Sequence, residues 1–109
     1  MTRTQQVTIT IAYPNEEAAQ TASEELVGLR LAACGQVSRI LSTYRWNDEI
    51  VSSEEYLLTL KTSAECLNGI ADYVGKTHEY EVSEIIATPV LWAEERYSAW
   101  IEENVQKKC

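Results

Sequence analysis

Two long runs of β-prone residues, separated by only two residues, constrain the fold more than any other feature of this chain. The runs span 34–46 and 49–61, and Asn47-Asp48 between them are residue types that tolerate the left-handed conformations of a tight turn. Together they predict a long β-hairpin. Apolar and polar residues do not alternate cleanly along the first run, which indicates either a bulge or an arm that extends beyond its own core.

The N-terminal part of the chain shows a strand pattern followed by a helix pattern. Apolar side chains recur at every second position over residues 7–13, which predicts a strand with one buried face. Pro14 ends this strand, and Asn15 is a suitable N-cap for a helix over about residues 16–30.

The C-terminal half continues the alternation of strands and helices. Thr62-Ser63-Ala64-Glu65 reads as a capping box, with the threonine hydroxyl as the cap, before a second helix that ends at Gly75. A fourth strand over residues 84–91 and an amphipathic helix over 93–105 complete the chain. The order β-α-β-β-α-β plus a terminal helix predicts an α+β, ferredoxin-like fold with two helices on one face of a four-stranded sheet.

Composition narrows the class of protein. The chain has 109 residues, 45% of them apolar, which fits a single domain over residues 1–109. Seventeen Asp and Glu against nine Lys and Arg give a net charge of -8, which repels a phosphate backbone, so we expect no nucleic-acid partner. Because no apolar run approaches the ~20 residues that cross a bilayer and the first residues are polar, we expect a cytoplasmic protein without a membrane segment.

Three cysteines give no sign of a disulfide framework or a zinc site. Cys34, Cys66 and Cys109 are odd in number and lack the CxxC spacing of zinc knuckles. Cys34 and Cys66 lie among apolar residues, so we expect small core side chains there. Cys109 ends a polar tail, where we expect a free, exposed thiol.

The only histidine, His78, lies in an acidic and aromatic stretch over residues 78–84. Imidazole is the commonest metal ligand, so His78 beside three carboxylates is a candidate cation site. The spacing alone favours a solvated loop before a strand, because metal sites usually show several His or Cys ligands at fixed intervals. If residues 78–84 are extended, their ends lie ~20 Å apart and cannot share one ion. A metal would then require a turn or a second chain.

Three segments resemble one family. The segments are 30–34 at the end of the first helix, 44–50 at the hairpin tip, and 78–86 around the histidine. Their sequences, in this order and at this spacing over about residues 7–105, are similar to signatures of the CutA divalent-cation-tolerance family. The resemblance implies a tight homotrimer in which long β-hairpins extend sheets across subunit boundaries, which would explain the irregular first arm.

The resemblance also implies a ligand cleft between subunits. The residues expected to line this cleft come from the hairpin and the histidine loop, and they are Tyr44, Trp46, Lys61, Tyr80 and Glu84. His78 is the expected metal ligand. For the aromatic members, packing at the subunit interface is the competing explanation. Family members with the fullest copper site have a cysteine and a second histidine where this chain has Ile11 and Thr77, which weakens the case for copper.

We therefore expect a homotrimeric protein of divalent-cation tolerance that binds a cation such as copper, or a small ligand, with no obligatory cofactor. The alternative is a trimeric scaffold or signalling protein that acts through protein-protein contacts without metal. An enzyme is not expected, because the four glycines form no phosphate-binding loop and no nucleophile motif surrounds the histidine.

Overall fold

A computed structural model describes residues 4–107 and 109 of the chain. In this part of the chain, four strands and three α-helices form an α+β fold. No helix among the described residues has both the length and the apolar run that crossing a bilayer requires. The elements in chain order are β1 (Gln6–Tyr13), α1 (Glu16–Gly28), β2 (Cys34–Trp46), β3 (Glu49–Ser63), the short 3₁₀ helix η1 (Ala64–Cys66), α2 (Leu67–Thr77), β4 (Ile85–Pro89) and α3 (Glu95–Asn104).

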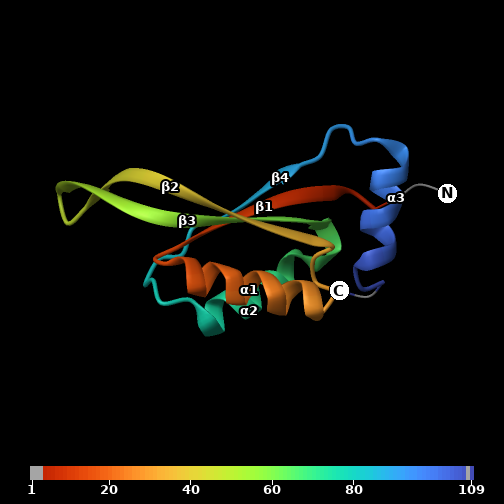
Figure 1. Ribbon diagram of the computed structural model, residues 1–109, viewed down its shortest axis with the longest axis horizontal. Coiled ribbons are helices and arrows are strands. Elements are labelled where there is room, and N and C mark those ends of the chain that lie inside the picture. Colours follow the sequence, from red (N-terminus) through yellow and green to blue (C-terminus); the bar gives the residue numbers. More distant parts are fainter. Residues whose placement is uncertain (1–3, 108) are drawn as a thin grey trace.

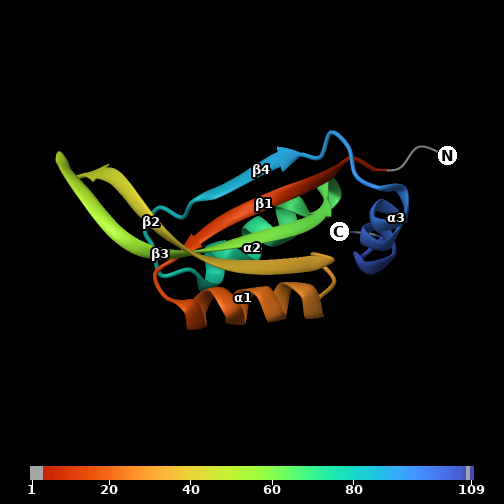
Figure 2. The same cartoon turned by 45° about the horizontal axis from the view of Figure 1, so that its top comes forward.

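The four strands form one antiparallel sheet with the order β2-β3-β1-β4. Helices α1 and α2 cover one face of this sheet, and α3 packs at the end of the sheet away from the hairpin tip (Figures 1 and 2). Strand β4 lies at an edge, where Pro89 removes no hydrogen bond from a central ladder, as its sequence position indicated. The other face of the sheet carries no helix of the described chain.

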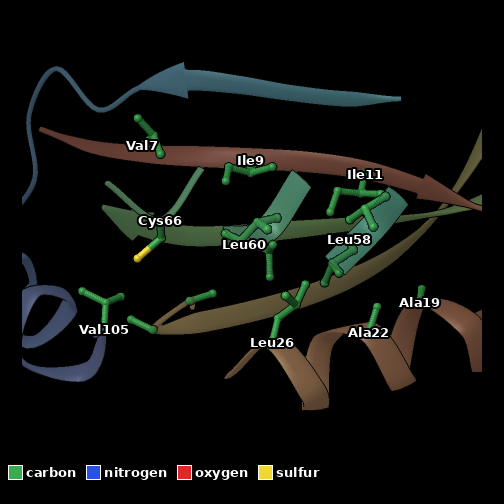
Figure 3. Close-up of a cluster of buried hydrophobic side chains, with 14 of the residues drawn as sticks. Val7, Ile9, Ile11, Ala19, Ala22, Leu26, Leu58, Leu60, Cys66 and Val105 are labelled. Carbon is green, nitrogen blue, oxygen red and sulfur yellow. The ribbon is translucent and has the colours of Figure 1, made fainter. Parts of the chain in front are cut away.

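The core lies between the sheet and its two helices (Figure 3). The predicted period of two along β1 is confirmed, because Ile9 and Ile11 are fully buried, whereas Thr8 and Thr10 between them are only partly buried. Leu58 and Leu60 of β3 pair beside Ile11 and Ile9 and point to the same side. Residues of the opposite parity on these strands therefore face the side without helices. Helix side chains that complete the core include Ala19, Ala22, Leu26, Ile70 and Val74.

The predicted hairpin is present, but the bulge is not. Strands β2 and β3 pair residue for residue from Cys34↔Lys61 to Trp46↔Glu49 without an insertion. Asn47 and Asp48 have positive φ values of 50° and 65°, as the two-residue turn requires. The alternative explanation for the irregular polarity, an arm that extends beyond its own core, fits the structure. The hairpin extends beyond the helices (Figure 1), and Leu41 on it is 85% exposed.

Two element boundaries differ from the sequence prediction for local reasons. Helix α1 ends at Gly28 rather than near Arg30, because Arg30 takes a left-handed φ of 60° that no α-helix continues. The cap before α2 was assigned to the wrong residue. The Thr62 side chain points into the core and donates to the Leu31 carbonyl oxygen at 2.6 Å, and Ser63 accepts the Glu65 backbone N–H at 3.3 Å instead. The last strand and helix are each shorter than expected, at Ile85–Pro89 and Glu95–Asn104.

The expectation of a free thiol at Cys109 was wrong. Cys109 forms a disulfide with the buried Cys66, and Cys34 is the free cysteine. The reason is a return of the C-terminal segment to the core: Val105 packs on it, and the Gln106 backbone N–H donates to the Arg30 carbonyl oxygen at 2.8 Å. Such long-range contacts are not visible in cysteine spacing.

Candidate ligand-binding pocket

A pocket of about 480 Å³ opens where the hairpin leaves the body of the sheet. Its floor includes Ala12 of β1 and Glu55 of β3, whose parity places them on the face without helices. The segment between α2 and β4 bends at Glu81 and Val82 and forms the opposite wall. The pocket is lined by Ala12, Ser42, Thr43, Tyr44, Trp46, Val51, Glu55, Tyr80, Glu81, Val82 and Glu84.

A hydrogen bond between Tyr80 and Glu55 joins this wall to the floor. The Tyr80 hydroxyl donates to Glu55 Oε2 at 2.7 Å, and Glu55 is only 6% exposed although it is a carboxylate. Burial, and then the bond to Glu55, raise the pKa of the Tyr80 phenol well above its ordinary value. Tyr80 therefore remains a hydrogen-bond donor throughout the neutral range, and its bond holds the buried Glu55 side chain at the floor of the pocket.

His78 lies behind this wall and not in the pocket lining. Its Nε2 lies 2.6 Å from the Ala12 carbonyl oxygen, and its Nδ1 accepts the Tyr80 backbone N–H at 3.1 Å. A carbonyl oxygen can only accept, so Nε2 carries the proton and Nδ1 the lone pair. The ring also stacks on Tyr13, with centroids 4.4 Å apart. Both ring nitrogens thus hold the Tyr80 segment in place, and neither has a lone pair left for a metal.

The sequence-predicted cleft residues fall into two groups. Tyr44, Trp46, Tyr80 and Glu84 line the pocket together. Lys61 lies elsewhere in the same chain: it pairs with Cys34 near the other end of β3, and its Nζ lies 5.4 Å from the Tyr97 ring centroid in a cation-π contact.

Two acidic residues of the pocket were missed as site residues. Glu81 belongs to the histidine loop but was treated only as part of an acidic stretch, and Glu55 was not considered. The position of Glu55 in its strand could have revealed it. Tyr56 and Leu58 occupy the positions of β3 that face the core, so Glu55, at an alternate position, projects toward the face without helices. Its burial depends on the Tyr80 contact, which has no local signature.

The described residues contain no group of three His, Cys, Asp or Glu side chains placed to hold a metal ion. The two positions that depart from the fuller copper site also have other roles. Ile11 is fully buried in the core, and the Thr77 hydroxyl donates to the Tyr73 carbonyl oxygen at 2.8 Å. Within one chain, the arrangement offers aromatic faces and carboxylates around a cavity of small-molecule size rather than a preformed coordination sphere.

The CutA1 divalent ion tolerance protein family matches residues 7–104, which is most of the chain. The chain belongs to this family. It is 40% identical over 97 residues to a probable divalent-cation tolerance protein cutA homolog from Encephalitozoon cuniculi, with 89% of this chain and 85% of that protein covered. A divalent-cation tolerance protein CutA from Thermus thermophilus is 38% identical, with 88% and 94% covered.

The fold is also that of solved CutA1 structures. The crystal structure of CutA1 from Oryza sativa superposes with a TM-score of 0.92 at 27% identity, covering 96% of this chain and 97% of that one. The resemblance in the three sequence segments is therefore confirmed by the whole chain and by its three-dimensional structure. The four-stranded sheet with its long hairpin is the family's fold.

Proposed function

We propose that this CutA1 family member is a homotrimeric, cytoplasmic protein of divalent-cation tolerance. In this proposal the fold is the ferredoxin-like one with an added C-terminal helix, and the long hairpins extend sheets between subunits. The pocket of Glu55 and Tyr80 then lies at a subunit boundary and reversibly binds a small ligand or a divalent cation such as copper. No catalytic step and no obligatory cofactor are involved.

Exposed apolar side chains support the trimer. Leu41 and Ile50 on the hairpin are 85% and 65% exposed, and Leu91 and Trp92 after β4 are exposed as well. Large apolar groups gathered on projecting segments are typical of surfaces that another chain covers. The hairpin's edge strand β2 is also free to pair, and symmetric assembly is the usual way in which long edge strands are covered.

One observation supports ligand binding most strongly. Glu55 is a buried carboxylate in an open pocket, held by the hydroxyl of Tyr80 and flanked by the exposed rings of Tyr44 and Trp46. A buried charge costs stability unless a partner compensates it, so a chain that keeps one in a cavity gains by binding something there.

The cytoplasmic assignment has a consequence for the disulfide. Thiol reductants keep most cytosolic cysteines reduced, so a disulfide between Cys66 and Cys109 would there be in exchange with the two thiols. Alkylation of free thiols in intact cells, followed by mass spectrometry, measures the fraction in each state. A fully oxidised pair in growing cells would argue for an oxidising compartment.

Assembly and binding are tested separately. Sedimentation velocity is expected to give a species of three 12.3 kDa chains at micromolar concentration, and a 12.3 kDa species would refute the trimer. Calorimetric titration with Cu(II), Zn(II) and Ni(II) then compares the parent with Glu84→Gln, which changes the pocket, and with His78→Ala, which changes the residue behind it. If no metal and no small molecule binds to the trimer, the ligand-binding proposal is wrong and the scaffold alternative remains.

A further inference from the structure

We propose that the pocket is selective for a small organic cation with an amidinium or ammonium group. This rests on the proposed function, since it names the chemical class of ligand for the same pocket. The charge of the lining, the aromatic walls and the size of the cavity each favour this class of ligand.

The pocket lining is acidic without any cation from the described chain. It contains Glu55, Glu81 and Glu84 and no Lys, Arg or His. The two ion pairs between described residues, Arg39–Glu54 and Arg96–Glu94, lie outside the pocket. Glu55 therefore has a neutral donor, the Tyr80 hydroxyl, but no cationic partner among the residues that the structure describes. A cationic ligand would supply it, and the net charge of -8 would attract that ligand to the surface.

Aromatic side chains distinguish an organic cation from a bare ion. Tyr44 and Trp46 present partly exposed rings from β2, and Tyr80 faces them from the other wall. The faces of Trp and Tyr rings attract cations and stack on planar groups, and an amidinium is both charged and planar. The combination of ring faces with a buried carboxylate is the pattern by which proteins recognise organic cations.

Size and ligand geometry favour a molecule over a metal ion. A cavity of about 480 Å³ lies in the range of small-molecule sites, whereas a metal needs several ligands within about 2.0–2.6 Å of one point. The described residues provide no such set, and the nitrogens of His78 are both engaged. The pocket carboxylates come from two different walls, and they are Glu55, Glu81 and Glu84. They are better suited to attract a cationic molecule through their combined negative charge than to coordinate one metal ion.

Three probes of similar shape test this inference: benzamidinium, the neutral benzamide and the anionic benzoate. Isothermal titration of the intact protein is expected to give benzamidinium an affinity roughly tenfold or more above that of benzamide, with benzoate the weakest. Glu55→Gln should remove most of the preference for benzamidinium over benzamide, as measured by the ratio of the two affinities. Glu54→Gln is the matched control, because Glu54 is the neighbouring residue of β3 but points away from the pocket toward Arg39.

A second pair of variants guards against misfolding of Glu55→Gln. The exposed residues Glu84 and Trp46 can be changed to Gln and Leu, and each change should weaken benzamidinium binding at least about threefold. Equal affinities for benzamidinium and benzamide would overturn the inference. Preferential binding of benzoate would also overturn it, because a lysine from another subunit would then govern the cleft. Metal binding without benzamidinium binding refutes this inference alone, whereas absence of all binding also refutes the proposed ligand function.

Discussion

The disulfide between Cys66 and Cys109 allows a prediction that depends on contacts far apart in the sequence. Cys66 is fully buried at the junction of β3 and α2, and Cys109 follows the last helix. We expect Cys109→Ser to release the C-terminal segment from covalent attachment while leaving the packing of Ile101 and Val105 on the core in place. The variant should therefore fold and yet be less stable.

The size of the effect follows from the length of the closed loop. The two cysteines are 43 residues apart. Restricting the unfolded chain by a loop of this length corresponds to an entropy of about 13 cal/mol/K, or about 4 kcal/mol at 25 °C, and measured effects often fall below this limit. We therefore expect Cys109→Ser to lower the free energy of unfolding by about 2–4 kcal/mol under oxidising conditions.

Urea unfolding at one fixed protein concentration, with and without dithiothreitol, measures this loss. In reductant the parent and Cys109→Ser should agree closely, and without reductant the parent alone should become more stable. Cys34→Ser is the matched control, because Cys34 is the free cysteine. A titration of the native parent under oxidising conditions should find one thiol per chain. Three thiols, together with equal stability of parent and variant, would refute the reasoning.

Three further predictions concern buried polar and close-packed groups. Gly35→Ala places a Cβ against Ser23 Oγ, closer than van der Waals contact allows, and should lower the free energy of unfolding in urea by about 1–3 kcal/mol. Ser23→Ala in the same chain should reduce this loss, and an unchanged stability of Gly35→Ala would contradict the clash. Thr62→Val keeps the side-chain shape but leaves the Leu31 carbonyl unpaired, so the same assay should show a loss of about 1–3 kcal/mol; an unchanged value would contradict the 2.6 Å bond. Burial raises the pKa of Tyr13 to about 12, so the unfolded state loses its proton first and stability should fall as pH rises from about 10 to 12. In Tyr13→Phe the free energy of unfolding should decrease less over this pH range. An equally large decrease in the variant would show that other groups cause it.

Local patterns in the sequence were sufficient for most of the fold. The period of two along β1, the N-cap at Asn15 and the two-residue turn at Asn47-Asp48 each depend on neighbouring residues, and the structure has all of them. Of the two explanations for the irregular first arm, the bulge was wrong, because the polarity of a strand reports the exposure of its side chains and not whether its backbone pairing is interrupted. A strand can pair without interruption and still carry apolar residues on both faces when it lies outside its own core.

The candidate pocket could be predicted only in part. Tyr44 and Trp46 share a face of β2 by strand period, so their proximity follows from sequence. The burial of Glu55 and the bond from Tyr80 require the segment after α2 to fold back over β3, which no local pattern specifies. The engagement of both nitrogens of His78 has the same origin, since one partner is the Ala12 carbonyl of the distant first strand.

The uninterrupted ladder of the hairpin limits how its length can change. Adding one residue to each arm beyond the pair Trp46↔Glu49 lengthens the hairpin and keeps every pair below it in register. Adding one residue to β2 alone, between Cys34 and Tyr44, would instead turn Tyr44 and its alternate neighbours to the opposite face. Removing the last pair would delete Trp46 from the pocket. The arm can therefore grow at its turn independently of the pocket, but it cannot shrink without removing part of the pocket lining.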